Sequence, residues 1–130
     1  HETSNVANVS QRAALAAVDG PLDTVFAMRE SFNRRRILIH GLINEIPGMS
    51  CIDPQGAFYA FANVKGVLGR EIEGRKITTS MEFVELLLDE VKVAVVPGEA
   101  FGAPGYVRFS YALNDDEIVE GLQLIKTLLS

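Results

Sequence analysis

The sequence predicts an α+β domain of two layers, in which a small sheet of about four strands is covered on one face by about four helices. Segments with a helical apolar period and segments with strand-like alternation follow one another along the chain. The length of 130 residues suits one domain, and the apolar fraction of 48% supports a core. We therefore expect residues 1–130 to form a single domain without internal repeats.

Two helices are predicted in the N-terminal part of the chain. The first runs from about Val6 to Val18, and the stop signal Asp19-Gly20-Pro21 follows it. The second runs from about Leu22 to Ile46, before Pro47-Gly48. Its apolar residues fall close to one stripe, which we expect to be buried: Leu22, Val25, Phe26, Phe32, Ile39, Leu42, Ile43 and Ile46.

Two further helices are predicted from capping chemistry. Thr79 and Glu82 have the spacing of a capping box, and an apolar helical pattern follows them. Asn114 can cap the last helix, and the acidic residues after it suit the positive end of the helix dipole. The buried stripe of this last helix is expected to comprise Ile118, Leu122, Ile125 and Leu129.

Four strands are predicted, and the first two are expected to pair as a hairpin. Residues 65–77 (Lys65 to Ile77) have three glycines and little periodicity, so we interpret them as a plain surface loop rather than a substrate-entrance lid. The expected strands are Met49–Ile52, Ala57–Val64, a buried strand Val93–Val96, and Tyr106–Leu113.

One arginine stands in the middle of the last strand. Val107, Phe109, Tyr111 and Leu113 are expected on the core face, so Arg108 takes the opposite face. A permanent cation is rarely buried without a partner. Arg108 is therefore either an edge-strand arginine that reaches water or pairs with a surface carboxylate, or a clamp that holds a ligand carboxylate through two parallel hydrogen bonds.

Three ordered motifs occur along the chain: Asn5–Ala17, Pro54–Phe61, and Val95–Gly98 with Phe101–Gly102 and Val107–Ala112. Together they resemble class I/II aminotransferases of the aspartate aminotransferase type, which are pyridoxal-phosphate enzymes of fold type I. The resemblance covers nearly the whole chain and identifies it with the C-terminal small domain of that family. It favours the clamp, because Arg108 matches the arginine that binds the substrate α-carboxylate.

The resemblance also implies which parts of the active site this chain lacks. No lysine lies in a segment like the family's lysine motif, and no glycine-rich phosphate loop is visible, so the cofactor pyridoxal 5'-phosphate is expected on an upstream large domain. No catalytic residue is expected in this chain, which is predicted to be inactive alone. Phe101 either lines the substrate pocket beside Arg108 or belongs to the core. Ser4 and Asn5 match a segment near the family's dimer interface, and residues 1–8 are expected to be displaced without the large domain.

Composition excludes several other classes of function. The formal net charge of −5 argues against nucleic acid or an anionic membrane as partner, and no apolar run has the length of a membrane span. Cys51 is the single cysteine, so neither a disulfide framework nor a thiolate metal site is expected, and a cytoplasmic location fits. The basic run Arg34–Arg36 is expected to be a solvated helix face, and His40 a helix-surface residue rather than a catalytic one.

The complete protein is therefore expected to be a homodimeric, cytoplasmic aminotransferase. It would transfer an amino group between an amino acid such as aspartate and a 2-oxo acid. Two alternatives stay open at this point. One is a carbon–sulfur lyase or other pyridoxal-phosphate enzyme of the same fold, which would keep Arg108. The other is a stand-alone ligand-binding domain without catalysis.

Overall fold

The computed structural model describes residues 5–130 and divides into two compact units, residues 1–31 and residues 32–130. In the first unit, α1 (Asn8–Asp19) ends before Gly20, as predicted. Helix α2 (Asp23–Asn44) begins in the first unit and ends in the second. No side chain of residues 5–31 is buried. The expected displacement of residues 1–8 falls partly on residues 1–4, which lie outside the described residues.

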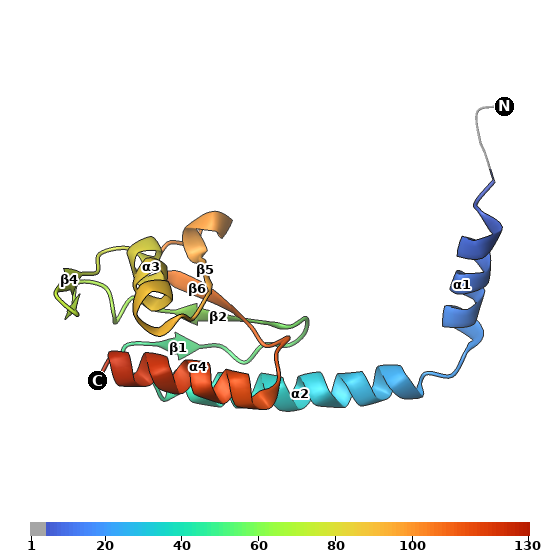
Figure 1. Ribbon diagram of the computed structural model, residues 1–130, viewed down its shortest axis with the longest axis horizontal. Coiled ribbons are helices and arrows are strands. Elements are labelled where there is room, and N and C mark those ends of the chain that lie inside the picture. Colours follow the sequence, from blue (N-terminus) through green and yellow to red (C-terminus); the bar gives the residue numbers. More distant parts are fainter. Residues whose placement is uncertain (1–4) are drawn as a thin grey trace. The chain divides into compact units, whose positions relative to one another are not determined.

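The second unit has the predicted α+β architecture (Figure 1). Its sheet is antiparallel, with the strand order β1-β2-β6-β5. The predicted hairpin is confirmed, because Ser50 of β1 pairs with Asn63 of β2. The four strands are β1 (Ser50–Cys51), β2 (Tyr59–Asn63), β5 (Val96–Pro97) and β6 (Tyr106–Ser110).

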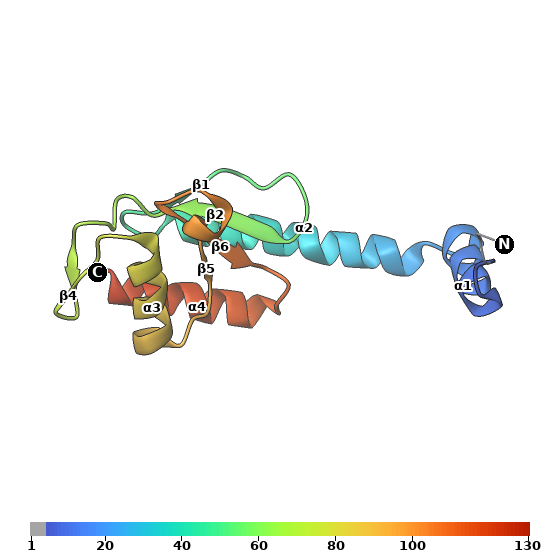
Figure 2. The same ribbon diagram turned by 90° about the horizontal axis from the view of Figure 1, so that it is seen from above.

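Three helical segments cover one face of this sheet. The second half of α2 and helix α4 (Asp115–Leu128) run side by side (Figures 1 and 2), and α3 (Ser80–Val91) packs against α4, β5 and β6. Apart from Phe109, the sheet contributes small or branched side chains to the core between the layers, and the helices contribute mostly larger ones. The core includes Ala60, Ala62, Val107 and Phe109 from the sheet, and Ile39, Ile43, Phe83, Leu86, Leu87, Ile118, Leu122 and Ile125 from the helices.

Capping chemistry fixes the ends of α3 and α4, as the sequence predicted. The Thr79 hydroxyl accepts a hydrogen bond from the Glu82 amide, and the Glu82 carboxylate accepts from the Thr79 amide. Asn114 and Glu117 form the same reciprocal pair at α4. The predicted apolar stripe of α4, from Ile118 to Leu129, is buried as expected.

Residues 65–77 are not the plain loop that the sequence suggested. They contain a small hairpin, β3 (Glu71–Ile72) and β4 (Arg75–Lys76). The turn residues Glu73 and Gly74 both have positive φ, which matches the twist of a two-residue hairpin. Val67, Ile72 and Ile77 are buried, so this segment belongs to the core.

Three apolar predictions are also wrong. The run from Val93 to Val96 is half-buried rather than a buried strand, because β5 is only Val96–Pro97 and lies at the edge of the sheet. Leu113 is exposed because β6 ends at Ser110. The start of the α2 stripe, namely Leu22, Val25 and Phe26, is exposed within the first unit.

We predict that Glu82→Gln makes folding of the chain less sensitive to acid. Hydrogen bonds from the Thr78 hydroxyl and backbone, and then from Thr79, hold the pKa of Glu82 below its ordinary value of about 4.5. Because the pKa is lowered by folding, this contribution to stability is complete above about pH 4.5 and is lost as the pH falls through the lower folded value.

Circular dichroism melts at a series of pH values would check this prediction. Between about pH 6 and pH 3, the melting temperature of the unmodified chain should fall further than that of Glu82→Gln. Glu85→Gln is the matched control, since Glu85 is exposed on the same helix and has no hydrogen-bond partner in residues 5–130. Superimposable pH profiles for Glu82→Gln and the unmodified chain would contradict the prediction.

Candidate functional site

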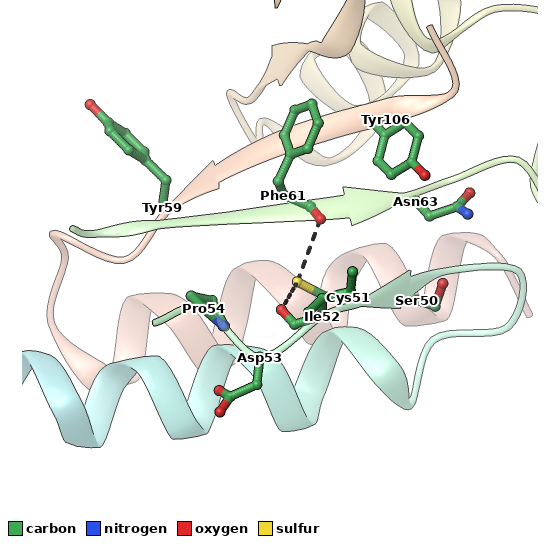
Figure 3. Close-up of a pocket in the computed structure, with 9 residues that line it drawn as sticks. All are labelled: Ser50, Cys51, Ile52, Asp53, Pro54, Tyr59, Phe61, Asn63 and Tyr106. Carbon is green, nitrogen blue, oxygen red and sulfur yellow. Dashed lines mark hydrogen bonds between the residues drawn. The ribbon is translucent and has the colours of Figure 1, made fainter. Parts of the chain in front are cut away.

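The open face of the sheet carries the polar and aromatic side chains of β2 and β6. Alternation along β6 sends Val107 and Phe109 into the core, so Tyr106, Arg108 and Ser110 take the opposite face, as the sequence predicted. In β2, Phe61 lies directly across from Arg108 in the register. Figure 3 shows Tyr59, Phe61 and Tyr106 rising from the side of the sheet that faces away from α2 and α4.

Arg108 is half-buried at the centre of this face. Its guanidinium carbon lies 4.2 Å from the centre of the Tyr59 ring and 4.5 Å from the centre of the Phe101 ring. Both distances are within the range of a cation–π contact. Among residues 5–130, no carboxylate pairs with Arg108 and no hydrogen bond involves its side chain. The donors of the guanidinium are therefore free for an external anion.

Phe101 is exposed, which rules out the core alternative for this residue. It lies in the 3-10 turn η1 (Gly98–Phe101) after β5, and 48% of its surface is accessible. Its ring also meets the Phe61 ring edge-on, with 6.2 Å between the ring centres. The sequence prediction that Phe101 lies beside Arg108 is confirmed, whereas its contact with a substrate stays a prediction.

A hollow of about 400 Å³ opens beside this aromatic surface, between β1 and β2 (Figure 3). Ile52 and Pro54 line one wall, and Tyr59, Phe61 and Tyr106 line the other. Such a mixture of apolar walls and few polar groups is typical of a small-molecule site.

Residues 1–125 match the protein family described as aminotransferase class I and II. This chain belongs to that family. It is 56% identical over its whole length to an aspartate aminotransferase of Streptomyces avermitilis and 43% identical over 97% of its length to one of Bacillus subtilis. It spans 32% and 31% of those two proteins, about a third of each.

Solved structures of aminotransferases contain a part with the same fold. The aspartate aminotransferase of Rhizobium meliloti superposes with a TM-score of 0.91 at 41% identity, over 98% of this chain and 32% of that one. The alanine aminotransferase of Pyrococcus furiosus gives a TM-score of 0.80 at 29% identity, over 90% of this chain and 28% of that one. The resemblance seen in the sequence motifs is therefore confirmed at the level of the family and the fold.

The lysines of this chain do not fit the cofactor pyridoxal phosphate, whose aldehyde needs a lysine amine that is free and also lies in the substrate site. The Lys126 ammonium pairs with Glu45 at 3.0 Å, and that of Lys92 donates to the Asp89 carbonyl at 2.6 Å. The Lys65 ammonium lies over the Tyr106 ring, and Lys76 is exposed in β4.

The helix N-termini do not offer a phosphate site either. The first amides of α3 donate to the Glu82 and Glu99 carboxylates, and Asn114 and Glu117 cap α4. A phosphate at either end would have to displace a carboxylate of the chain itself. Among the lysines and the N-termini of α3 and α4, residues 32–130 therefore offer neither the lysine nor the phosphate cradle that the cofactor requires.

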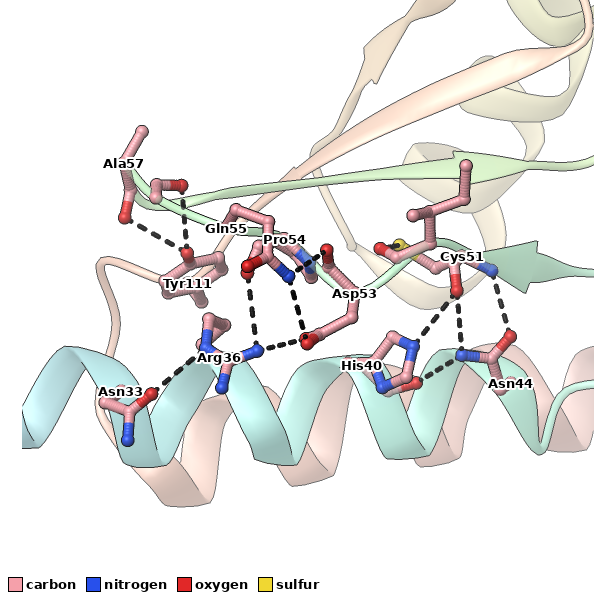
Figure 4. A network of polar contacts seen from close by, with 12 residues as sticks. Asn33, Arg36, His40, Asn44, Cys51, Asp53, Pro54, Gln55, Ala57 and Tyr111 are labelled. Carbon is pink, nitrogen blue, oxygen red and sulfur yellow. Dashed lines mark hydrogen bonds and ion pairs between the residues drawn. The ribbon is translucent and has the colours of Figure 1, made fainter.

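A polar network fixes β1 and the loop after it to α2, and thereby shapes one wall of the hollow (Figure 4). The Asn44 amide both donates to the Cys51 carbonyl at 3.1 Å and accepts from the Cys51 amide at 2.9 Å. His40 Nε2 lies 3.1 Å from the same carbonyl. His40 is thus half-buried with a structural partner in β1 rather than free on the helix surface, and its lack of a catalytic role stays a prediction.

The arginine run is only in part the solvated face that the sequence suggested, because Arg34 is exposed whereas Arg35 and Arg36 are half-buried. Arg34 and Arg35 pair with Asp115 at 2.7 and 3.1 Å, and these hydrogen bonds hold the pKa of the Asp115 carboxyl below its ordinary value. Arg36 pairs with Asp53 in the loop after β1. The basic run therefore joins α2 to α4 and to the wall of the hollow. The spacing of residues along one helix cannot predict these ion pairs, because their partners lie in distant parts of the sequence.

Several other expectations about the site have a structural outcome. Cys51 is a free, buried thiol, and burial raises its pKa, so it is a poor nucleophile. Within residues 5–130, no cluster of possible metal ligands is present, and no helix is long and apolar enough to cross a membrane. Asn5 is exposed, whereas Ser4 lies outside the described residues.

We predict that Asn44→Ala destabilises the chain by about 1–3 kcal/mol, since it removes two hydrogen bonds to the Cys51 backbone. Urea unfolding followed by circular dichroism would measure the change. Asn44→Asp keeps the acceptor for the Cys51 amide and should therefore lose less stability. Asn33→Ala is the control, because Asn33 is exposed on the same helix and accepts only from Arg36. Equal stability of Asn44→Ala and Asn33→Ala would contradict the assigned role.

Proposed function

We propose that the complete protein is a pyridoxal-phosphate-dependent aminotransferase in which Arg108 binds the α-carboxylate of the amino-acid substrate. The family membership of the chain supports the reaction class. The assignment of the binding site rests on one observation. The Arg108 guanidinium contacts two aromatic rings on the open face of the sheet and has no anionic partner within residues 5–130.

A guanidinium suits this task for a geometric reason. Its planar fork offers parallel N–H donors to both oxygens of a carboxylate, and such charge-assisted bonds are stronger than neutral ones. Every amino acid and every 2-oxo acid carries the same carboxylate next to the reacting carbon. An arginine fixed on a rigid strand therefore positions both substrates of a transamination in the same way.

Aspartate is the proposed amino donor, and a 2-oxo acid the acceptor. The relatives from Streptomyces avermitilis, Bacillus subtilis and Rhizobium meliloti are named aspartate aminotransferases. We place the pyridoxal phosphate on the part of the protein upstream of this chain, because the lysines of residues 5–130 do not fit it. A homodimer and a cytoplasmic location stay predictions of the sequence, as does the inactivity of this chain alone.

The proposal predicts that Arg108→Ala in the complete enzyme lowers kcat/KM for all amino-acid substrates alike. A hydrogen bond to a charged group contributes roughly 1.5–3 kcal/mol, so a loss of about ten- to several-hundred-fold is expected. Arg108→Lys should recover only part of it, because lysine lacks the planar fork. Steady-state kinetics with aspartate and 2-oxoglutarate would measure these changes.

Arg75→Ala provides a matched control for the loss of one arginine. Arg75 lies in the separate β3–β4 hairpin, where it pairs with Asp89 at 2.8 Å. This control should retain the kcat/KM of the unmodified enzyme. An Arg108→Ala enzyme with unchanged kcat/KM would reject the carboxylate clamp, and turnover of cystathionine in preference to aspartate by the unmodified enzyme would favour a carbon–sulfur lyase.

A further inference from the structure

The guanidinium of Arg108 is flanked by aromatic rings from two different elements. Tyr59 belongs to β2 and Phe101 to η1, which follows β5. In the sheet, β2 and β5 are the two neighbours of β6, so the rings reach Arg108 from opposite sides of its strand. The two ring centres lie at nearly equal distances from the guanidinium carbon, 4.2 and 4.5 Å.

We propose that Tyr59 and Phe101 are positioning residues, which hold the Arg108 guanidinium in one orientation so that its edge is presented to the substrate carboxylate. This inference rests on the function proposed above for Arg108. A long arginine side chain loses considerable rotamer freedom when it is fixed for binding. Rings that fix it before the substrate arrives reduce that cost, and they also keep water and stray anions from the faces of the guanidinium.

Other contacts hold the two rings in place. Phe101 meets Phe61 edge-on, and Phe61 stacks on Tyr106 with 5.1 Å between ring centres and an interplanar angle of 10°. Tyr59 packs against the Phe58 ring, with 4.3 Å between the ring centres. The rings thus form two groups, one with Phe101 and one with Tyr59, and the Arg108 guanidinium contacts one ring of each group.

The turn that carries Phe101 is anchored to the start of α3. The buried Ser80 hydroxyl accepts from the Gly105 amide at 2.6 Å, and the Ser80 amide donates to the Glu99 carboxylate at 3.2 Å. Gly98 has no room for a larger residue, because an added Cβ would lie 2.1 Å from the Ala103 carbonyl oxygen. This turn is thus built to a fixed shape, as a positioning role for Phe101 requires.

The test uses single replacements in the complete enzyme that remove a ring but keep an apolar side chain. A cation–π contact is weak where it is exposed to water and stronger where water is excluded. Tyr59→Leu and Phe101→Leu should therefore each lower kcat/KM for aspartate about two- to thirty-fold. The loss should appear mainly as a higher KM. Tyr59→Phe and Phe101→Tyr keep the ring and should stay within about two-fold of the unmodified enzyme.

A double-mutant cycle separates positioning from a general structural effect. If the rings act through the guanidinium, Tyr59→Leu and Phe101→Leu should have no further effect on kcat/KM in an Arg108→Ala background. Melting temperatures of all variants would identify any loss of folding. If a variant has a clearly lower melting temperature than the unmodified enzyme, Tyr59→Met or Phe101→Met replaces it in the cycle, since methionine also removes the ring.

The outcomes distinguish this inference from the proposed function. Unchanged kcat/KM in Arg108→Ala would overturn the function of Arg108 itself. A large loss in Arg108→Ala together with unchanged kinetics in Tyr59→Leu and Phe101→Leu would overturn only the positioning role. Equal losses from the ring replacements with and without Arg108 would also overturn it, since the rings would then act independently of the guanidinium.

Discussion

The alternation of side chains along β6 is the constraint on which the site depends. Val107 and Phe109 must be buried against the helices, so the residue between them has to point the other way. That residue is a permanent cation, and the face that receives it is the one that α2, α3 and α4 leave open. A shift of one residue in the register would bury the charge and expose the core, so packing of the core and orientation of Arg108 are enforced together.

A cation on an open sheet face still needs surroundings that hold it without neutralising it. Carboxylate partners would compete with a substrate for the same donors, and the acidic residues that cap α3 and α4 are engaged in the helix termini instead. Aromatic rings attract the guanidinium through their faces and leave its donor edge free. The structure therefore separates two tasks, since ion pairs join the elements of the scaffold and π contacts surround Arg108.

Sequence reasoning succeeded where the determinants are local. The capping box at Thr79, the cap at Asn114 and the alternation in β6 involve residues a few positions apart, and the structure has them as predicted. It failed where the outcome depends on distant partners. The β3–β4 hairpin is too short to show a period, and the apolar run at Val93 could equally be a central or an edge strand. Contact of Tyr59 with Arg108 depends on the strand order, which one sequence does not state.

The most direct test of the account is a crystal structure of the complete enzyme with a dicarboxylate substrate analogue. We expect both oxygens of one carboxylate to accept from the Arg108 guanidinium at about 2.7–2.9 Å, in its plane. The rings of Tyr59 and Phe101 should still lie against the guanidinium faces. An analogue bound with neither carboxylate on Arg108, together with an Arg108 guanidinium that pairs with a carboxylate of the protein, would contradict the account.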